Sequence, residues 1–127
     1  MRVAIPVFNG RVSPLFDAAQ RILIVDVVDG EEAARTDRSI AGLLPWQRAK
    51  LLSENGVSDL ICGAISMPMM HMLVANGVRI TNNIAGSVDE VLKAHTAGTL
   101  PSSEFMMPGC RWRRRGRFRH GYGPRCM

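Results

Sequence analysis

The sequence has little cysteine and no long apolar run, and residues 107–127 contain no acidic side chain. Its three cysteines are an odd number without the spacing of a disulfide framework. The apolar runs are too short to cross a bilayer, and no signal-peptide pattern opens the chain. These absences favour a soluble cytoplasmic protein with no membrane partner, whose cysteines are free thiols or metal ligands.

The motifs of common enzyme classes are also missing. The sequence contains no Ser-His-Asp set, phosphate-binding loop or dinucleotide fingerprint. Asp17, Asp26 and Asp59 are too scattered in sequence to indicate a two-metal carboxylate cluster. We therefore predict that the protein is not an enzyme.

The net charge of +5 is unevenly distributed along the chain. Residues 1–106 carry nine basic and eleven acidic side chains, for a net charge of −2. Residues 107–127 carry seven arginines, for a net charge of +7. Such an asymmetry indicates a separate functional segment.

Residue patterns predict alternating strands and helices over residues 1–100. Strands are expected at 3–7, which should end near Pro6, at 22–28 and 33–38, and at 57–62 and 78–81. Helices are expected at 45–54 and 67–75, and after the capping box that begins at Ser87. Two successive helix–Asn-Gly–strand units are typical of parallel crossovers, whereas Asp29-Gly30 indicates an antiparallel hairpin.

These elements predict an α/β fold of three layers, α/β/α, with a mixed sheet of about five strands. Residues 1–100 form the domain. The periodicity stops at Pro101, so residues 101–127 are expected to be a basic tail with arginine and cysteine that is disordered when alone.

Ligands of open α/β sheets bind at the carboxyl ends of the parallel strands. Segments 9–17, 62–66 and 81–87 should meet there. Cys62 ends a strand, precedes Gly63 and lies shortly before a helix capped by Ser66. The helix dipole should lower the pKa of this thiol and favour the metal-binding thiolate. The alternative is that Cys62 is a small buried apolar side chain.

The tail combines arginines with thiols and aromatic rings. Arginines interleaved with Trp112, Phe118 and Tyr122 suit single-stranded nucleic acid. The same composition suits an anionic metal cluster, because guanidinium groups stabilise negative charge and thiolates bind metal. A solubilising basic tail is the third interpretation. Cys110 and Cys126 lack the close cysteine spacing of a zinc finger.

Several segments, in this order and spacing, resemble the dinitrogenase iron–molybdenum cofactor biosynthesis family. They are VAIPV at 3–7, VSPLFDAA at 12–19, the strand and turn at 22–30, LICGAIS at 60–66 and MMPGC at 106–110. The resemblance implies a ribonuclease-H-like fold without nuclease activity. It also implies non-catalytic binding or carrying of an iron–sulfur or iron–molybdenum cluster, or its precursor, with metallocluster assembly or acceptor proteins as partners.

The resemblance also directs attention to particular residues. Leu15 stands where many relatives have histidine, which makes Cys62 the better candidate ligand within the fold. The candidate cluster-binding residues are Ser13, Phe16, Cys62, Gly63 and Ser66, and the candidate metal ligands are Cys62, Cys110, His120 and Cys126. The alternative function is a nucleic-acid or acidic-partner binding module that acts through the tail. A third is a regulatory domain with a protein partner.

Overall fold

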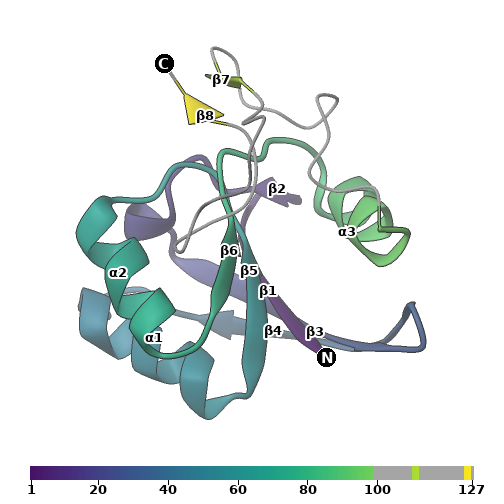
Figure 1. Ribbon diagram of the computed structural model, residues 1–127, viewed down its shortest axis with the longest axis horizontal. Coiled ribbons are helices and arrows are strands. Elements are labelled where there is room, and N and C mark those ends of the chain that lie inside the picture. Colours follow the sequence, from purple (N-terminus) through teal and green to yellow (C-terminus); the bar gives the residue numbers. More distant parts are fainter. Residues whose placement is uncertain (99–109, 112–124, 127) are drawn as a thin grey trace.

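Residues 1–98 form a mixed β-sheet with helices on both faces (Figure 1). The structure is a computed structural model that describes residues 1–98, 110–111 and 125–126. Its strands are β1 (Arg2–Phe8), β2 (Arg11–Val12), β3 (Arg21–Val28), β4 (Glu31–Ser39), β5 (Val57–Ile61) and β6 (Arg79–Thr81). Its helices are α1 (Pro45–Glu54), α2 (Met67–Ala75) and α3 (Val88–Thr96), together with the 3-10 turn η1 (Phe16–Ala18). None of the helices described is long and apolar enough to span a membrane.

The strand order is β4-β3-β1-β5-β6, with β2 paired to β1. Strand β3 runs antiparallel to both β1 and β4, whereas β1, β5 and β6 are parallel. This arrangement confirms the predicted three-layer α/β fold. The sheet has six strands where about five were predicted, because the two residues of β2 add a short antiparallel partner to β1.

Strand β1 continues past Pro6, where the sequence predicted its end. The Pro6 carbonyl accepts from the Ser13 amide at 2.8 Å, so both backbone groups of Pro6 face away from β3. The β5 pairing on that side has already ended at Ala4. The missing N–H therefore removes no β1–β3 bond, and proline is tolerated in this central strand.

The three helices begin at the predicted residues. Proline occupies the first turn of α1. The Ser66 hydroxyl accepts from the Met69 amide at 3.3 Å, and the Ser87 hydroxyl accepts from the Glu90 amide at 3.2 Å. These caps satisfy amides that the first helical turn leaves unpaired.

Each face of the sheet has its own apolar core. Helices α1 and α2 contribute Leu52, Met69 and Leu73 to one core, and α3 contributes Val91 and Leu92 to the other. Figure 1 shows α1 and α2 on one side of the sheet and α3 on the other. Each fully buried aliphatic side chain stabilises the fold by roughly 1.5–3 kcal/mol, so both helix layers contribute to stability.

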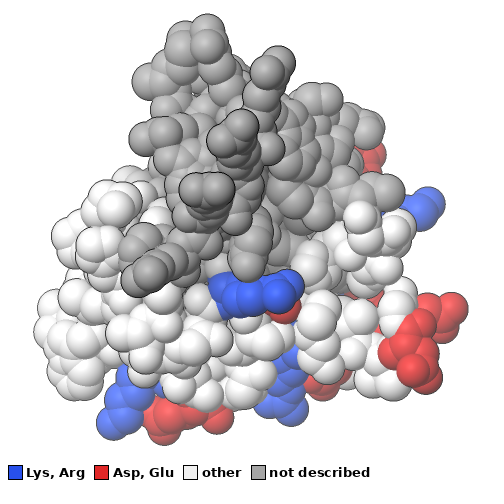
Figure 2. Space-filling view, viewed as in Figure 1, with Lys and Arg blue, Asp and Glu red and all other residues white. Residues whose placement is uncertain are grey.

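Strand β4 belongs to neither core, because all nine of its residues are exposed. It joins β3 through a tight turn in which Asp29 and Gly30 have φ values of 53° and 77°. Acidic side chains gather at the end of this hairpin, which projects from the body (Figure 2). The charged edge discourages pairing with other chains.

Within the tail, the structure describes one short strand pair. Strands β7 (Cys110–Arg111) and β8 (Arg125–Cys126) are antiparallel, with Cys110 opposite Cys126 and Arg111 opposite Arg125. The sequence patterns did not predict this pairing. The disorder predicted for the rest of the tail lies outside the described residues.

Candidate functional site

Three loops meet at the carboxyl ends of β1, β5 and β6, as the predicted parallel strands led us to expect (Figure 1). The Ala64 amide donates to the Pro14 carbonyl at 2.8 Å, and the Phe16 amide donates back to the Ala64 carbonyl at 2.9 Å. The Asn83 amide donates to the Gly63 carbonyl at 2.8 Å. The loop after β5 is thus held by backbone hydrogen bonds on both sides.

Gly63 lies where the loop after β5 contacts the Ser13–Pro14 backbone. A Cβ atom at this position would be 2.6 Å from both the Ser13 and the Pro14 carbonyl oxygens. The absence of a side chain at Gly63 therefore allows its backbone to approach the Ser13–Pro14 backbone. Any ligand that used the same space would have to displace the Ser13–Pro14 segment.

Cys62 is fully buried in the core beneath α1 and α2. Burial raises the pKa of its thiol well above the ordinary value, and the negative charge of Asp17 raises it further. The predicted lowering of this pKa is therefore wrong. The main cause is the loss of water around the sulfur, which favours the neutral thiol.

Ser66 links the end of this loop to α2 and also binds Asp17. The Ser66 amide donates to Asp17 Oδ1 at 2.9 Å, and its hydroxyl donates to Asp17 Oδ2 at 2.5 Å. The carboxylate thus lies at the N-terminus of α2, where backbone amides favour negative charge. An anionic ligand at Ser66 would have to replace Asp17.

Phe16 and Ser13 are buried beneath the same loops. The Arg48 guanidinium lies over the Phe16 ring, 5.8 Å from its centroid. Its Nη1 donates to the Phe16 carbonyl at 2.9 Å and to the Ala19 carbonyl at 2.7 Å. Burial lowers the pKa of Arg48. Arg48 therefore holds η1 against α1 and is a structural part of this region.

Arg48 and Asp17 were missed as contributors to this region. Arg48 precedes the buried Leu52 by four residues, so both lie on the same face of α1. A charged side chain on this apolar face was the sequence signal that could have identified Arg48. Asp17 belongs to the segment that carried the family resemblance, but its partner Ser66 lies 49 residues further along the chain. No local pattern predicts that pairing.

Of the predicted metal ligands, only Cys62 lies within residues 1–98. Among the residues that the structure describes, no group of three His, Cys, Asp or Glu side chains could hold a metal ion. Cys62 lies in the core, whereas Cys110 and Cys126 face each other in the register of β7 and β8. His120 lies outside the described residues.

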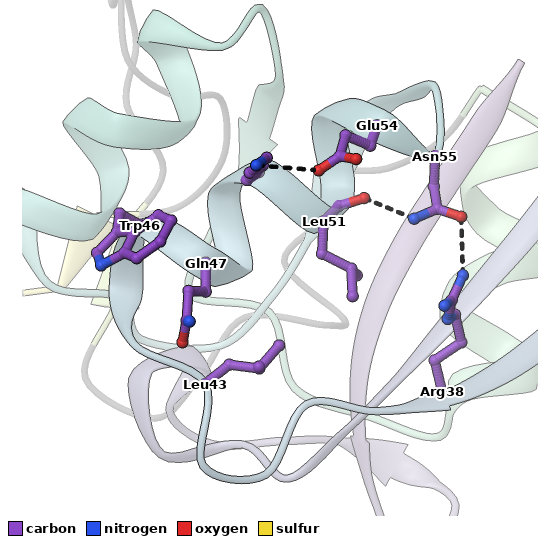
Figure 3. A pocket seen from close by; sticks show the side chains of 8 residues that line it. Arg38, Leu43, Trp46, Gln47, Leu51, Glu54 and Asn55 are labelled. Atoms are coloured by element: carbon purple, nitrogen blue, oxygen red, sulfur yellow. Dashed lines mark hydrogen bonds and ion pairs between the residues drawn. The ribbon is translucent and has the colours of Figure 1, made fainter.

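A separate surface hollow of about 340 Å³ lies beside α1 (Figure 3). Leu43, Trp46 and Leu51 line its apolar part. Its polar side chains are largely occupied with one another, since Arg38 Nη1 donates to Asn55 Oδ1 at 3.0 Å and Lys50 pairs with Glu54 at 4.0 Å. This hollow contains none of the predicted site residues.

The strand order defines a mixed α/β domain, which is followed by a tail that carries two cysteines. The family model described as dinitrogenase iron-molybdenum cofactor matches residues 1–98. The chain belongs to this family, which confirms the resemblance found in the sequence.

One sequence relative and two solved structures illustrate what the chain is similar to. An uncharacterised protein of Methanocaldococcus jannaschii is 26% identical over 109 residues, which cover 82% of this chain and 92% of that protein. The crystal structure of the protein PH0822 has a TM-score of 0.75 at 19% identity and covers 81% of this chain and 95% of its own. The apo form of the orange protein from Desulfovibrio gigas has a TM-score of 0.66 at 20% identity, with coverages of 83% and 94%.

Proposed function

We propose that this protein binds an iron–sulfur or iron–molybdenum cluster, or a precursor of one, and carries it to an assembly or acceptor protein without catalysing a reaction. The observation that best supports this proposal is the register of β7 and β8. It sets Cys110 opposite Cys126 in a chain of the iron–molybdenum cofactor family. Thiolates are the usual protein ligands of iron–sulfur clusters.

We assign Cys110 and Cys126 as the first pair of ligands and His120 as a further ligand. The surrounding sequence supports this assignment, because residues 107–127 hold seven arginines and no acid. Cations favour the thiolate form of cysteine and stabilise the negative charge of a cluster. The cargo would therefore meet ligands and counter-charges in one short segment.

We assign the loops at the sheet edge to a second part of the site, formed by Ser13, Phe16, Cys62, Gly63 and Ser66. The burial of Cys62 sets a condition on this part. Its thiol can reach a cluster only after the surrounding structure opens, and the close contact of the neighbouring Gly63 with the Ser13–Pro14 backbone holds this loop closed. The tail cysteines meet no such condition in our proposal, so they should bind first.

Anaerobic reconstitution with ferrous iron and sulfide tests the assignment, with bound iron and visible absorbance as readouts. Cys110→Ser and Cys126→Ser are compared with Cys62→Ala, which keeps a small apolar side chain in the core. We expect the tail variants to lose most of the bound iron and Cys62→Ala to retain it. Loss confined to Cys62→Ala would move the ligands to the loop. If the intact chain takes up neither this iron nor a preassembled cluster, the carrier function is wrong.

The charge separation supports a second candidate function, the binding of nucleic acid or an acidic partner through the tail. Seven arginine–phosphate contacts would give a slope of roughly −5 to −6 in a plot of log affinity against log salt. Affinity for a single-stranded oligonucleotide, measured by fluorescence anisotropy between low and physiological salt, tests this. A flat salt response would contradict it.

A further inference from the structure

The opposed cysteines of β7 and β8 have a second chemistry besides metal binding. Cys110 and Cys126 are direct partners in an antiparallel register. Such partners have Cα atoms about 4.5–5.5 Å apart, and disulfides join residues whose Cα atoms are roughly 4.4–6.8 Å apart. The backbone thus brings the two cysteines within the range that a disulfide requires.

We propose that Cys110 and Cys126 form a reversible cross-strand disulfide that removes both thiolates from the cluster site. The oxidant is a low-molecular-weight disulfide such as glutathione disulfide. One thiolate attacks it, forms a mixed disulfide and releases one glutathione thiolate. The second cysteine thiolate then attacks the protein sulfur of the mixed disulfide and releases the other. Two cysteines are oxidised by two electrons, and one glutathione disulfide is reduced to two glutathione thiols.

The sequence around both cysteines favours this exchange. Arg111 follows Cys110 and Arg125 precedes Cys126, and no acidic residue occurs between 107 and 127. A cationic neighbourhood increases the thiolate fraction, and the thiolate is the attacking species. Strands of two residues hold only marginally by themselves, so a covalent link would also fix the β7–β8 register.

Cys62 is unsuited to the same reaction. It is fully buried in an apolar core, and burial keeps its thiol in the neutral form. The chain therefore holds two cysteines placed for exchange and one that is protected from it. This difference provides an internal control in every measurement.

The regulatory meaning of the disulfide rests on the proposed carrier function. A disulfide sulfur cannot act as the thiolate ligand that iron requires. Only the reduced protein would accept a cluster, and an oxidised pool of small thiols would prevent loading. Since stable disulfides are rare in a reducing cytoplasm, the bond would respond to changes in redox state.

The test uses the reduced full-length chain, equilibrated at low concentration in buffers of increasing glutathione disulfide content. Free thiols are then trapped by alkylation, and the intact mass is measured. Trypsin cleaves after Lys93, Arg111 and Arg125, which places Cys110 in peptide 94–111 and Cys126 in the dipeptide 126–127. We expect these two peptides to be recovered joined, from a monomer that has lost two hydrogens. Treatment with dithiothreitol should separate them.

Variants identify the pair. Cys110→Ser and Cys126→Ser should each leave one tail cysteine that carries glutathione, whereas Cys62→Ala should form the link like the unmodified sequence. Recovery of both peptides separately with glutathione attached, or a link found only between two chains, would overturn the proposal.

Reconstitution of the reduced protein in parallel separates the two ideas. A disulfide in a protein that takes up no cluster would support this inference and contradict the carrier function. Cluster uptake by a protein that never forms the disulfide would support the carrier function and contradict this inference.

Discussion

Single atoms decide how tightly the loops close at the edge of the sheet. At Gly63 a methyl group would meet the Ser13 and Pro14 carbonyl oxygens at 2.6 Å. We expect Gly63→Ala to lower the free energy of unfolding by about 2–3 kcal/mol, because backbone must move to admit the new atom.

Gly56→Ala is the matched control for this substitution. Gly56 has a φ of 70° and no atom within 4 Å of a built Cβ, so its cost comes from backbone conformation alone and should be about 1 kcal/mol. Urea denaturation of both variants gives the comparison. An equal or smaller loss at Gly63 would show that the Ser13–Pro14 segment moves aside easily.

The thiol of Cys62 gives a second prediction at this scale. In the double variant Cys110→Ser and Cys126→Ser, only Cys62 remains to react with iodoacetamide. Because burial raises its pKa, we expect almost no alkylation of the folded protein at pH 8 and rapid alkylation in urea. Rapid alkylation without denaturant would mean that the loops open often enough to expose the sulfur.

At the scale of elements, the start of α2 depends on a residue from a distant loop. Asp17 accepts from both the amide and the hydroxyl of Ser66. We expect Asp17→Asn to lower the free energy of unfolding by about 1–2 kcal/mol, since a charged acceptor near a helix N-terminus is lost.

Asp37→Asn provides the comparison for Asp17→Asn. Asp37 pairs with Arg21 at the exposed edge of the sheet at 3.0 Å, and such pairs contribute roughly 0–1 kcal/mol. Thermal and urea unfolding of the two variants measure the difference. A loss at Asp17 no larger than that at Asp37 would mean that solvent replaces the carboxylate.

The sequence predicted the elements well because their signals are local. Proline in the first turn of α1 and the capping serines of α2 and α3 predicted all three helix starts. The edge at which the loops meet followed from the parallel strands. The state of Cys62 could not be predicted in the same way, because its burial depends on segments far away in sequence. The β7–β8 pair also joins residues that no short pattern connects.

At the scale of the whole molecule, His95 should make stability depend on pH. Burial lowers its pKa below the ordinary value near 6.5, with a smaller lowering from Arg79 and an opposing effect of Asp59. The unfolded chain then binds a proton more readily than the folded chain. The contribution to stability is present above pH 6.5 and is lost as the pH falls through the folded pKa.

Urea denaturation between pH 5 and pH 8 measures this dependence. We expect the unmodified protein to lose more stability on acidification than His95→Gln, which cannot take up the proton. Measurement at pH 8 gives the cost of the substitution itself, because the imidazole is neutral there in both states. Parallel curves for the two proteins would contradict the burial of His95 as the cause.

The exposure of β4 has a consequence for how the molecule opens. No side chain of Glu31–Ser39 reaches a core, but the next residue, Ile40, is 1% exposed and fastens the end of the strand. We therefore expect the strand to separate from β3 locally, starting at the Asp29-Gly30 turn and stopping at Ile40. Amide deuterium exchange would detect this as a sub-global opening in which β4 exchanges long before β1 and β5. The edge strand would then have a lower local stability than the centre of the sheet.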